Sequence, residues 1–237
     1  MLEFAKFAER IGLQRRLLAF IPHPDDETVG CGGLIHLARQ ADIEVHVIVV
    51  TDGAASHPVT DNWPRGRLAA TRRAELRAAL GTLGCLSEPL FLGLPDAGTE
   101  ALSAEQEAKA TERAAKFAEA LSPDVVLTTW RREPHCDHRF AYRLAQGVCG
   151  ALRLPLVEYM VWAPVIGSAT DLPLKRETDV LLLDVSPAAR AKDRAIRCHR
   201  SQLGKIRSDG FDLTPHLAEM MLPYERYECA RSLIASS

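Results

Sequence analysis

The chain has 237 residues, of which 47% are apolar and 25% charged, a composition typical of a water-soluble globular protein. Its 29 Lys and Arg residues nearly balance 31 Asp and Glu residues, and the net charge of −2 argues against nucleic acid or an acidic membrane surface as the main partner. No apolar run approaches the roughly 20 residues that span a bilayer, and the N-terminus has no signal-peptide core, so we expect a cytoplasmic protein without a membrane span.

The first part of the chain alternates short apolar runs with segments of helical spacing. Residues 17–21 form an apolar run typical of a buried strand, and we expect a helix over residues 27–40 after it. Residues 44–50 are rich in β-branched side chains and predict a second strand. A loop of polar residues, Pro and Gly follows over residues 54–66 and is the natural candidate for a segment that covers a substrate.

The ends of the next two helices are marked by residues with capping preferences. A leucine repeat at helical spacing begins at Leu76 and predicts a helix that ends at Gly84. Residues 89–94 form another strand-like run, and Ser103 is a favourable N-cap for a helix over residues 104–120.

The remaining elements continue the alternation. Residues 124–130, 156–162 and 180–185 are apolar runs, and a long last helix is expected to begin near Pro187 with Ser186 as its cap. Apolar strands that alternate with helices of this length indicate βαβ crossovers. The predicted fold class is therefore α/β, with a mainly parallel, doubly wound sheet and helices on both faces.

We expect one domain over residues 1–237, because no linker or internal repeat divides the chain. In a sheet of this kind ligands bind at the carboxyl ends of the strands. Two of the polar segments that follow strand ends are dense in His and Asp, residues 23–27 and residues 131–138.

These two segments contain the residue types of a catalytic metal site. His23 and Asp26 are three residues apart in a turn that enters a helix, so both can face one point. His135 and His138 offer a further imidazole, and two histidines with one carboxylate are a set that catalytic zinc uses. Such an ion lowers the pKa of its bound water and polarises a carbonyl, which leaves Asp25 free to act as general base.

Two other interpretations fit parts of the same pattern. The acidic residues from Asp25 to Glu27 are also favourable at a helix start, and His135 and His138 also fit a solvated surface. The H-x-D spacing from His23, with a distant histidine, matches the facial triad of non-haem iron oxygenases. Those triads are usually found in jelly-roll barrels, so the many helices between the strands disfavour this alternative.

At the two clusters the sequence resembles the LmbE/PIG-L family of zinc-dependent N-acetylglucosaminide de-N-acetylases, and the resemblance covers most of the chain. AFIPHPDDETVGCGG (residues 19–33) is similar to the first signature of the family. PHCDHR (residues 134–139) is similar to the second, which more often has Pro where Cys136 stands. Further segments that look like family blocks are residues 51–53, 72–84, 91–98 and 192–202.

The resemblance implies a Rossmann-like fold and one metal ion per chain. His23, Asp26 and His138 match the zinc ligands, and Asp25 matches the base that deprotonates the zinc-bound water. Two histidines and one carboxylate also accept Fe²⁺, so the expected cofactor is Zn²⁺ with Fe²⁺ as the alternative.

Other positions match residues that assist the reaction. The resemblance makes His135, held near Asp137, the group that stabilises the tetrahedral intermediate or protonates the leaving amine. Arg72 and Asp96 match positions that hydrogen-bond the sugar in some members. Some members have Tyr at the position of Glu133, where it helps the oxyanion, but an ionised Glu cannot donate a hydrogen bond. The sequence therefore leaves open which group donates a hydrogen bond to the oxyanion: another side chain, or zinc and His135 alone.

Three further features receive weaker interpretations. His199 is expected to be structural, and Trp63 is a candidate for stacking on a sugar face. The glycines at residues 30, 32 and 33 have the wrong spacing for a dinucleotide fingerprint, and close helix packing explains them.

The predicted function is hydrolytic removal of the acetyl group from a small-molecule, N-acetylglucosamine-type amino sugar conjugate. The alternatives are a non-haem iron oxygenase that uses the same His/Asp/His set and a sugar-binding relative without catalysis. The sequence selects no aglycone, and it contains no pattern that indicates an oligomeric interface.

Overall fold

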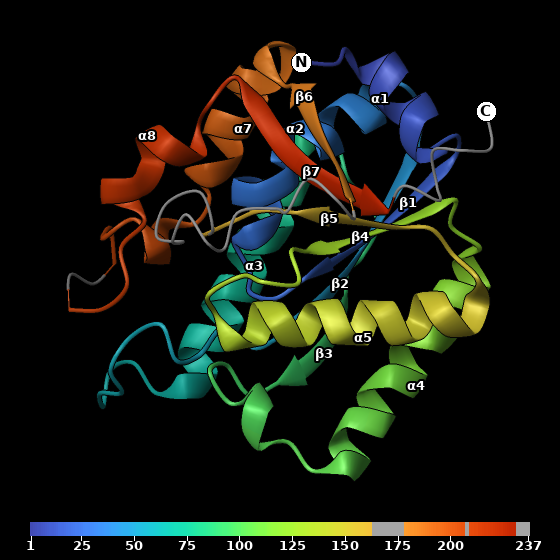
Figure 1. The fold of residues 1–237 in the computed structure, drawn as a ribbon. Helices are drawn as coiled ribbons and strands as arrows, with labels where there is room; N and C mark the ends of the chain where they lie inside the picture. Colours follow the sequence, from blue (N-terminus) through green and yellow to red (C-terminus); the bar gives the residue numbers. More distant parts are fainter. Residues whose placement is uncertain (163–177, 207–208, 231–237) are drawn as a thin grey trace.

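The computed structural model describes residues 1–162, 178–206 and 209–230, and within these its strands form one sheet in the order β3-β2-β1-β4-β5-β7-β6 (Figure 1). The first five strands in this order are parallel, and β7 is antiparallel to both of its neighbours. The predicted α/β class with a mainly parallel sheet is confirmed, whereas the antiparallel edge was not predicted. The strands are β1 (Arg16–Ile21), β2 (Glu44–Thr51), β3 (Leu90–Leu94), β4 (Val125–Thr129), β5 (Leu156–Tyr159), β6 (Thr178–Asp184) and β7 (Tyr224–Ala230).

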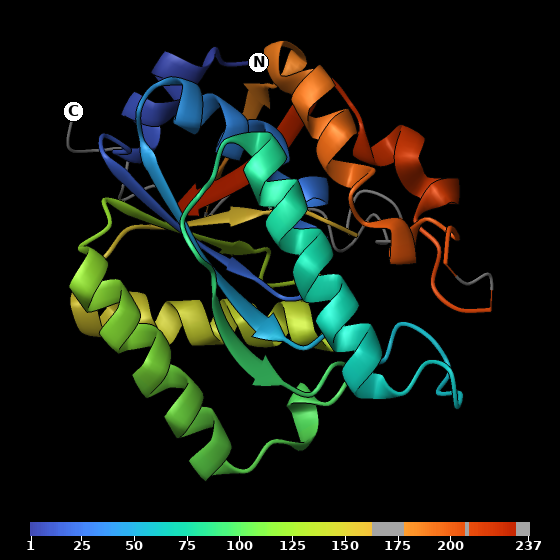
Figure 2. The same ribbon diagram turned by 180° about the vertical axis from the view of Figure 1, so that it is seen from behind.

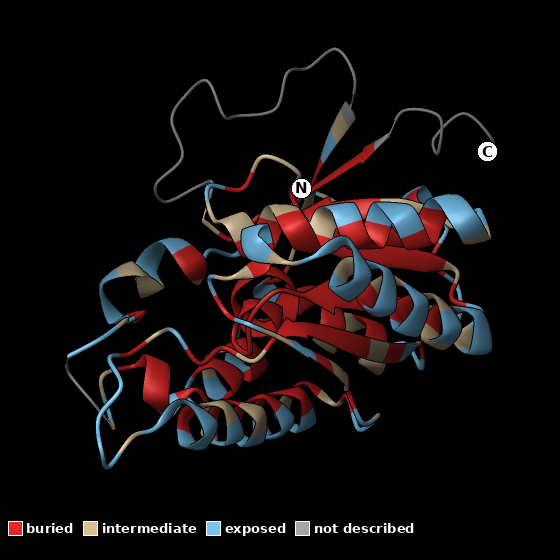
Figure 3. Ribbon diagram, turned by 90° about the horizontal axis from the view of Figure 1, so that it is seen from below, coloured by how far each residue is buried: buried red, intermediate tan, exposed pale blue. Residues whose placement is uncertain are grey.

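Helices cover both faces of the sheet. Helices α1, α2, α3 and α7 pack on one face, and α4 and α5 lie together on the other, as the two opposite views show (Figures 1 and 2). The central strands β1, β2 and β4 are therefore buried on both sides, which explains their continuous apolar sequences, whereas the edge strands β3 and β6 are partly exposed (Figure 3). No helix in the described ranges has the length and apolar character needed to cross a bilayer. The helices are α1 (Phe4–Ile11), α2 (Asp26–Gln40), α3 (Arg65–Leu83), α4 (Ala104–Leu121), α5 (Cys136–Leu152), α7 (Ala189–Ile196) and α8 (Leu217–Met220).

Two of the three predicted helix caps are confirmed. Ser103 and Gln106 form a reciprocal capping box at the start of α4, and Gly84 ends α3 with a left-handed φ of 88°. The prediction of a long last helix capped by Ser186 is wrong. Ser186 lies in a 3-10 turn and bonds Asp184, and α7 behind it has only 8 residues.

The glycines of α2 allow the helix to approach the sheet closely. A Cβ atom on Gly30 would lie 2.4 Å from the Tyr159 ring, and one on Gly33 would lie 2.4 Å from Val185. The packing interpretation is therefore confirmed for Gly30 and Gly33, whereas a Cβ on Gly32 would make only ordinary contacts of 3.5 Å or more. Between Gly30 and Gly33 the helix bends at Cys31, whose φ of −144° is not helical.

Buried carboxylates on the antiparallel edge are neutralised by basic partners. Glu225 lies 2.7 Å from Lys192 Nζ, and both side chains are buried. Glu158 on β5 faces Glu228 on β7 across the two strands, and Arg131 forms ion pairs with both. Burial raises the pKa of Glu158 to about 7, although Arg131 opposes this shift.

We expect Arg131→Met to lower the free energy of unfolding by about 3 kcal/mol at about pH 8, because two facing buried carboxylates lose their shared cation. The loss should shrink towards about pH 5. Folded Glu158 keeps its proton up to about pH 7 and the unfolded side chain only to 4.5, so folding takes up a proton and stability rises as the pH falls through this window. Urea unfolding at several pH values measures both effects. Adding Glu158→Gln to the variant is the control that should restore stability at high pH, and equal losses at high and low pH would contradict the interpretation.

Candidate active site

The two His/Asp segments meet at the point where the order of the sheet reverses. Strand β1 runs into the turn of residues 22–25 and α2, and β4 runs into residues 130–135 and α5. Strands β1 and β4 are parallel neighbours, but the chain continues from β1 to β2 on one side and from β4 to β5 on the other. Such a switch point is where α/β sheets bind their ligands.

The structure brings together the three predicted metal ligands. One carboxylate oxygen of Asp26, Oδ2, lies 3.2 Å from His23 Nδ1 and 3.2 Å from His138 Nε2. All three residues are buried, and His138 is fully inaccessible to solvent. Both ring nitrogens of His138 lack a hydrogen-bond partner of good geometry, which leaves Nε2 available to a metal ion.

The buried carboxylate of Asp26 and the buried histidines His23 and His138 stabilise the charged forms of one another. Burial alone raises the pKa of the Asp26 carboxyl, but His138 and His23 lower it well below its usual range. Burial lowers the pKa of His138, but Asp26 and Glu133 raise it to about 9. Hydrogen bonds to Asp137 and Asp26 likewise overcome burial and raise the pKa of His23 well above its ordinary value. The carboxylates therefore demand positive charge at this point, which a divalent cation can supply in place of two protons.

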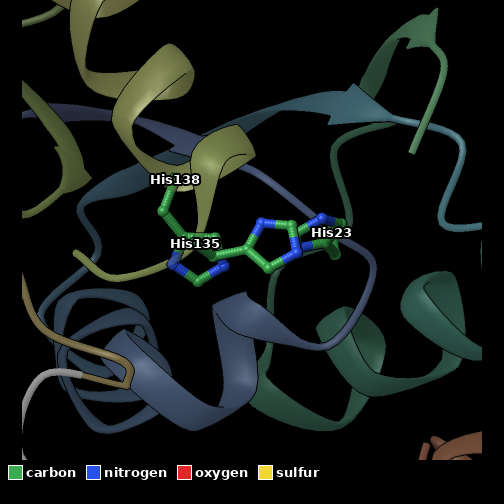
Figure 4. A group of neighbouring side chains, drawn as sticks. All are labelled: His23, His135 and His138. Atoms are coloured by element: carbon green, nitrogen blue, oxygen red, sulfur yellow. The ribbon is translucent and has the colours of Figure 1, made fainter. Parts of the chain in front are cut away.

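A third imidazole lies beside the predicted set. The side chains of His23, His135 and His138 gather at one point, the first from the turn after β1 and the others from the start of α5 (Figure 4). One ligand nitrogen of each lies within 4.8 Å of the others. His135 accepts the backbone N–H of Asp137 at Nδ1, over 3.2 Å, so its neutral ring has the proton on Nε2. Burial and the neighbouring histidines lower the pKa of His135, which favours this neutral form.

The carboxylate of Asp137 bonds His23. Asp137 Oδ2 lies 3.0 Å from His23 Nε2 and accepts the backbone N–H of Ala97 at 2.7 Å, while Oδ1 accepts the hydroxyl of Thr99 at 2.5 Å. His135 is near Asp137, as expected, but it is held by the backbone and not by the carboxylate. A carboxylate that fixes the free nitrogen of a histidine is the usual support of a metal-binding imidazole. Thr99 was missed because its contact with Asp137 spans 38 residues.

Asp25 faces the cavity beside the three predicted ligands and is held by Arg72. Arg72 Nη2 lies 3.0 Å from Asp25 Oδ1, and the same guanidinium donates to the carbonyl oxygens of Gly53 and Pro24. Gly53 has a φ of 66°, and a Cβ there would lie 2.9 Å from Arg72 Nη1, so glycine is needed at this position. Burial raises the pKa of Asp25, although Arg72 lowers it. Arg72 is 2% exposed; Nη1 and Nη2 have protein partners, whereas Nε has none among the described residues.

These residues line a cavity of about 550 Å³, a size within the range of small-molecule sites. Asp96 reaches it from the loop after β3, with Oδ1 3.2 Å from His23 Nε2 and Oδ2 accepting the N–H of Ala55. The lining also includes a group of mostly apolar residues, which could not be foreseen because they come from three separate segments. This group consists of Val29, Val161, Trp162, Phe211 and Leu213, together with His216.

Glu133 does not occupy the place of an oxyanion donor. Its carboxylate is buried and accepts the backbone N–H groups of Val161 and Trp162 at 2.8 and 2.9 Å. Oε2 also lies 3.3 Å from Nδ1 of His138. The signal in the sequence at this position was that Glu133 replaces the tyrosine found in some family members.

Two weaker interpretations are clarified by the structure. His199 is fully buried and bonds Glu27 Oε1 at 2.7 Å, outside the cavity lining, which agrees with a structural role. Trp63 lies under the guanidinium of Arg67 at 4.5 Å and is not among the residues that line the cavity. Within the loop of residues 54–66, Ala55 and Ser56 are the lining residues.

Fold and site together define an α/β enzyme with a His/Asp centre at the switch point of its sheet. A family model described as PIG-L, GlcNAc-PI de-N-acetylase, matches residues 18–149, more than half of the chain. A 1D-myo-inositol 2-acetamido-2-deoxy-alpha-D-glucopyranoside deacetylase of Mycolicibacterium vanbaalenii is 31% identical over 266 residues, which cover 91% of this chain and 90% of the relative. The chain therefore belongs to the PIG-L family of de-N-acetylases.

Solved structures share the fold at low identity. The zinc-inhibited form of teicoplanin deacetylase superposes with a TM-score of 0.68 at 19% identity, over 90% of this chain and 97% of that one. The 4-carboxy-2-hydroxymuconate hydratase of Pseudomonas putida KT2440 superposes with a TM-score of 0.67, also at 19% identity, over 88% and 83% of the two chains. The fold alone therefore does not decide the reaction. The family match does, and it confirms the predicted family and the predicted enzyme class, a hydrolase that removes an N-acetyl group from an acetylated amino sugar.

Proposed function

We propose that the chain is a zinc-dependent de-N-acetylase in which His23, Asp26 and His138 hold the metal ion. The observation that carries the proposal is the single Asp26 oxygen that lies 3.2 Å from a nitrogen of both histidines. The donor set suits catalytic zinc, and Fe²⁺ is the alternative ion because it accepts the same ligands. When bound, such an ion polarises the acetamide carbonyl and lowers the pKa of water.

Asp25 is the proposed general base. It lies next in sequence to the ligand Asp26, lines the cavity and is not itself needed to bind the metal. The guanidinium of Arg72 fixes the direction of this carboxylate, because its Nη2 lies 3.0 Å from Asp25 Oδ1. Burial raises the pKa of Asp25, which strengthens it as an acceptor for the proton of the attacking water. Arg72 is thus proposed to orient Asp25, in addition to the sugar-binding role that the sequence suggested.

His135 is the proposed partner of the oxyanion and the leaving amine. Its Nδ1 is occupied by the Asp137 N–H, so Nε2–H is the donor available to the cavity that His135 lines. A neutral imidazole with this tautomer donates a hydrogen bond to an oxyanion without charge repulsion from a nearby cation. Asp25 takes a proton from the attacking water as the water oxygen bonds to the amide carbonyl carbon. The C–N bond then breaks, the protonated Asp25 returns that proton to the leaving nitrogen, and the products are acetate and a free amine.

The substrate is proposed to be an N-acetylated amino sugar that carries an aglycone with an apolar face. The charged lining residues Asp25, Arg72 and Asp96 suit the acetamide and the sugar hydroxyls. Among the other lining residues, Trp162 lies edge-to-face with Phe211 and His216, with ring centroids 5.7 and 5.4 Å apart. Aromatic edges and faces bind apolar or C–H-rich surfaces better than charged groups.

The test is acetate release from N-acetylglucosamine conjugates by protein of measured metal content, with and without added zinc. The panel contains an aryl and an inositol conjugate of the same sugar. We expect zinc-dependent release, faster for the aryl conjugate at low substrate concentration. Release that needs no metal, or a chain that binds no metal under any loading, would refute the proposed site. Equal rates for the two conjugates would refute the apolar aglycone alone.

A further inference from the structure

We propose that Glu133 is a positioning residue for the metal site: its carboxylate accepts the Nδ1–H of His138 and thereby directs Nε2 to the metal ion. The same carboxylate holds residues 161 and 162, which follow β5 and form part of the cavity wall. The inference rests on the proposed assignment of His138 as a ligand, and it gives a role to the position at which this chain departs from relatives with tyrosine.

The surroundings of His138 leave few acceptors for a ring proton. The side chain is fully buried, so bulk water does not reach it. Nε2 faces the Asp26 oxygen at 3.2 Å, and Nδ1 faces Glu133 Oε2 at 3.3 Å. A histidine that binds a metal through Nε2 has its proton on Nδ1, and Glu133 is the carboxylate within reach of that atom. The 3.3 Å contact lacks hydrogen-bond geometry in this structure, and the inference is that it becomes a hydrogen bond when Nε2 binds the metal ion.

The chemistry of the position requires a carboxylate. Among the contacts within the described part of the chain, Oε1 accepts the Val161 N–H, and Oε2 accepts the Trp162 N–H and faces His138 Nδ1. A carboxylate accepts at both oxygens, whereas the amide of glutamine or the hydroxyl of tyrosine would place a donor against a donor. A negative carboxylate also makes the imidazole a stronger ligand.

The contacts also connect the metal ligand to the cavity wall. Val161 and Trp162 line the cavity, and the carboxylate that bonds their backbone nitrogens contacts His138. If the role of Glu133 were purely structural, its loss would loosen the segment after β5 and lower stability but leave the metal affinity unchanged. A positioning role predicts that the metal affinity falls even in protein that remains folded.

The test is the zinc affinity of Glu133→Gln, measured by competition with a chelator on protein whose folding is checked by circular dichroism. We expect the dissociation constant to rise about 10- to 100-fold, the usual effect of removing such a partner. Glu158→Gln is the matched control. Glu158 is also buried and also accepts a backbone N–H, that of Arg131 at 2.9 Å, in the segment that leads to Glu133. Its zinc affinity should stay that of the unaltered protein.

A second measurement needs no variant. Nitrogen-15 NMR of the zinc-loaded, histidine-labelled protein reports which ring nitrogen of His138 has a proton, and we expect Nδ1–H protected from exchange. A zinc affinity of Glu133→Gln equal to that of the unaltered protein would overturn the inference and leave the proposed function intact. A proton on Nε2 would overturn the inference and would also contradict the assignment of His138 Nε2 as a ligand atom. Failure of the unaltered protein to bind zinc would instead overturn the proposed function.

Discussion

Loss of the Asp25 carboxylate is expected to slow deacetylation by about 10²- to 10⁴-fold while the metal content stays at that of the unaltered protein. The reason is geometric. Asp25 lines the cavity next to the proposed ligands, and Arg72 holds it from 3.0 Å away. Because Asp25 is not itself a proposed ligand, its carboxylate can take a proton. Its removal deprives the attacking water of its base without opening the ligand set.

The measurement is kcat/KM of Asp25→Ala and Asp25→Asn on the best conjugate of the panel, with metal quantified in the same samples. Asp61→Asn is the control, since Asp61 is an exposed carboxylate in the loop of residues 54–66. A variant that retains zinc and nearly full activity would show that another group is the base. A variant that loses zinc would place Asp25 among the ligands.

Replacement of His138 by alanine is expected to remove the metal ion and the activity together. A bound ion contributes several kcal/mol to transition-state stabilisation, so the rate should fall by at least about 10³-fold. The variant also leaves the carboxylates of Asp26 and Glu133 facing an empty buried space, which adds a loss of stability.

Metal content by mass spectrometry and acetate release, measured on one preparation, test this expectation. His46→Gln is the matched control, because His46 is a half-buried histidine on β2 that does not line the active-site cavity. It should keep both the metal and the rate. A His138→Ala protein that is folded, metal-loaded and active would refute the ligand assignment.

The parallel half of the fold could be predicted because its physical signals are local. Strands buried on both faces read as continuous apolar runs, and Ser103 and Gly84 mark helix ends through their own backbone preferences. Helix α5 had a signal too, since Phe140, Leu144 and Val148 repeat at a spacing of four residues. This spacing predicts a helix directly after the His/Asp motif, an element that the expected order of strands and helices did not include.

Strand β7 could not be predicted in the same way. Its glutamates Glu225 and Glu228 read as solvent-exposed, yet both are buried because Lys192 and Arg131 neutralise them. These partners lie 33 and 97 residues away in the sequence, and only the folded chain shows the pairing.

In the candidate site, too, the convergence of the motifs could be predicted, whereas the long-range contacts could not. His23, Asp26 and His138 were expected to converge because the carboxyl ends of parallel strands share one edge of the sheet. The supporting contacts were not foreseen, since Glu133 acts through backbone nitrogens that lie 28 and 29 residues further along the chain. A backbone N–H leaves no mark in a sequence.

The site lies between β1 and β4, so it forms only when these two strands are paired. His23 and His138 are 115 residues apart and become neighbours when β4 pairs with β1. A fragment that ends before β4 lacks His138, and an unfolded chain has all three proposed ligands but does not hold them together. An ion that binds the folded form alone would shift the folding equilibrium by mass action, by about 2.7 kcal/mol at a free concentration 100 times its dissociation constant. In a cell, the supply of the ion would then set both the activity of the enzyme and the fraction of its chains that survive proteolysis.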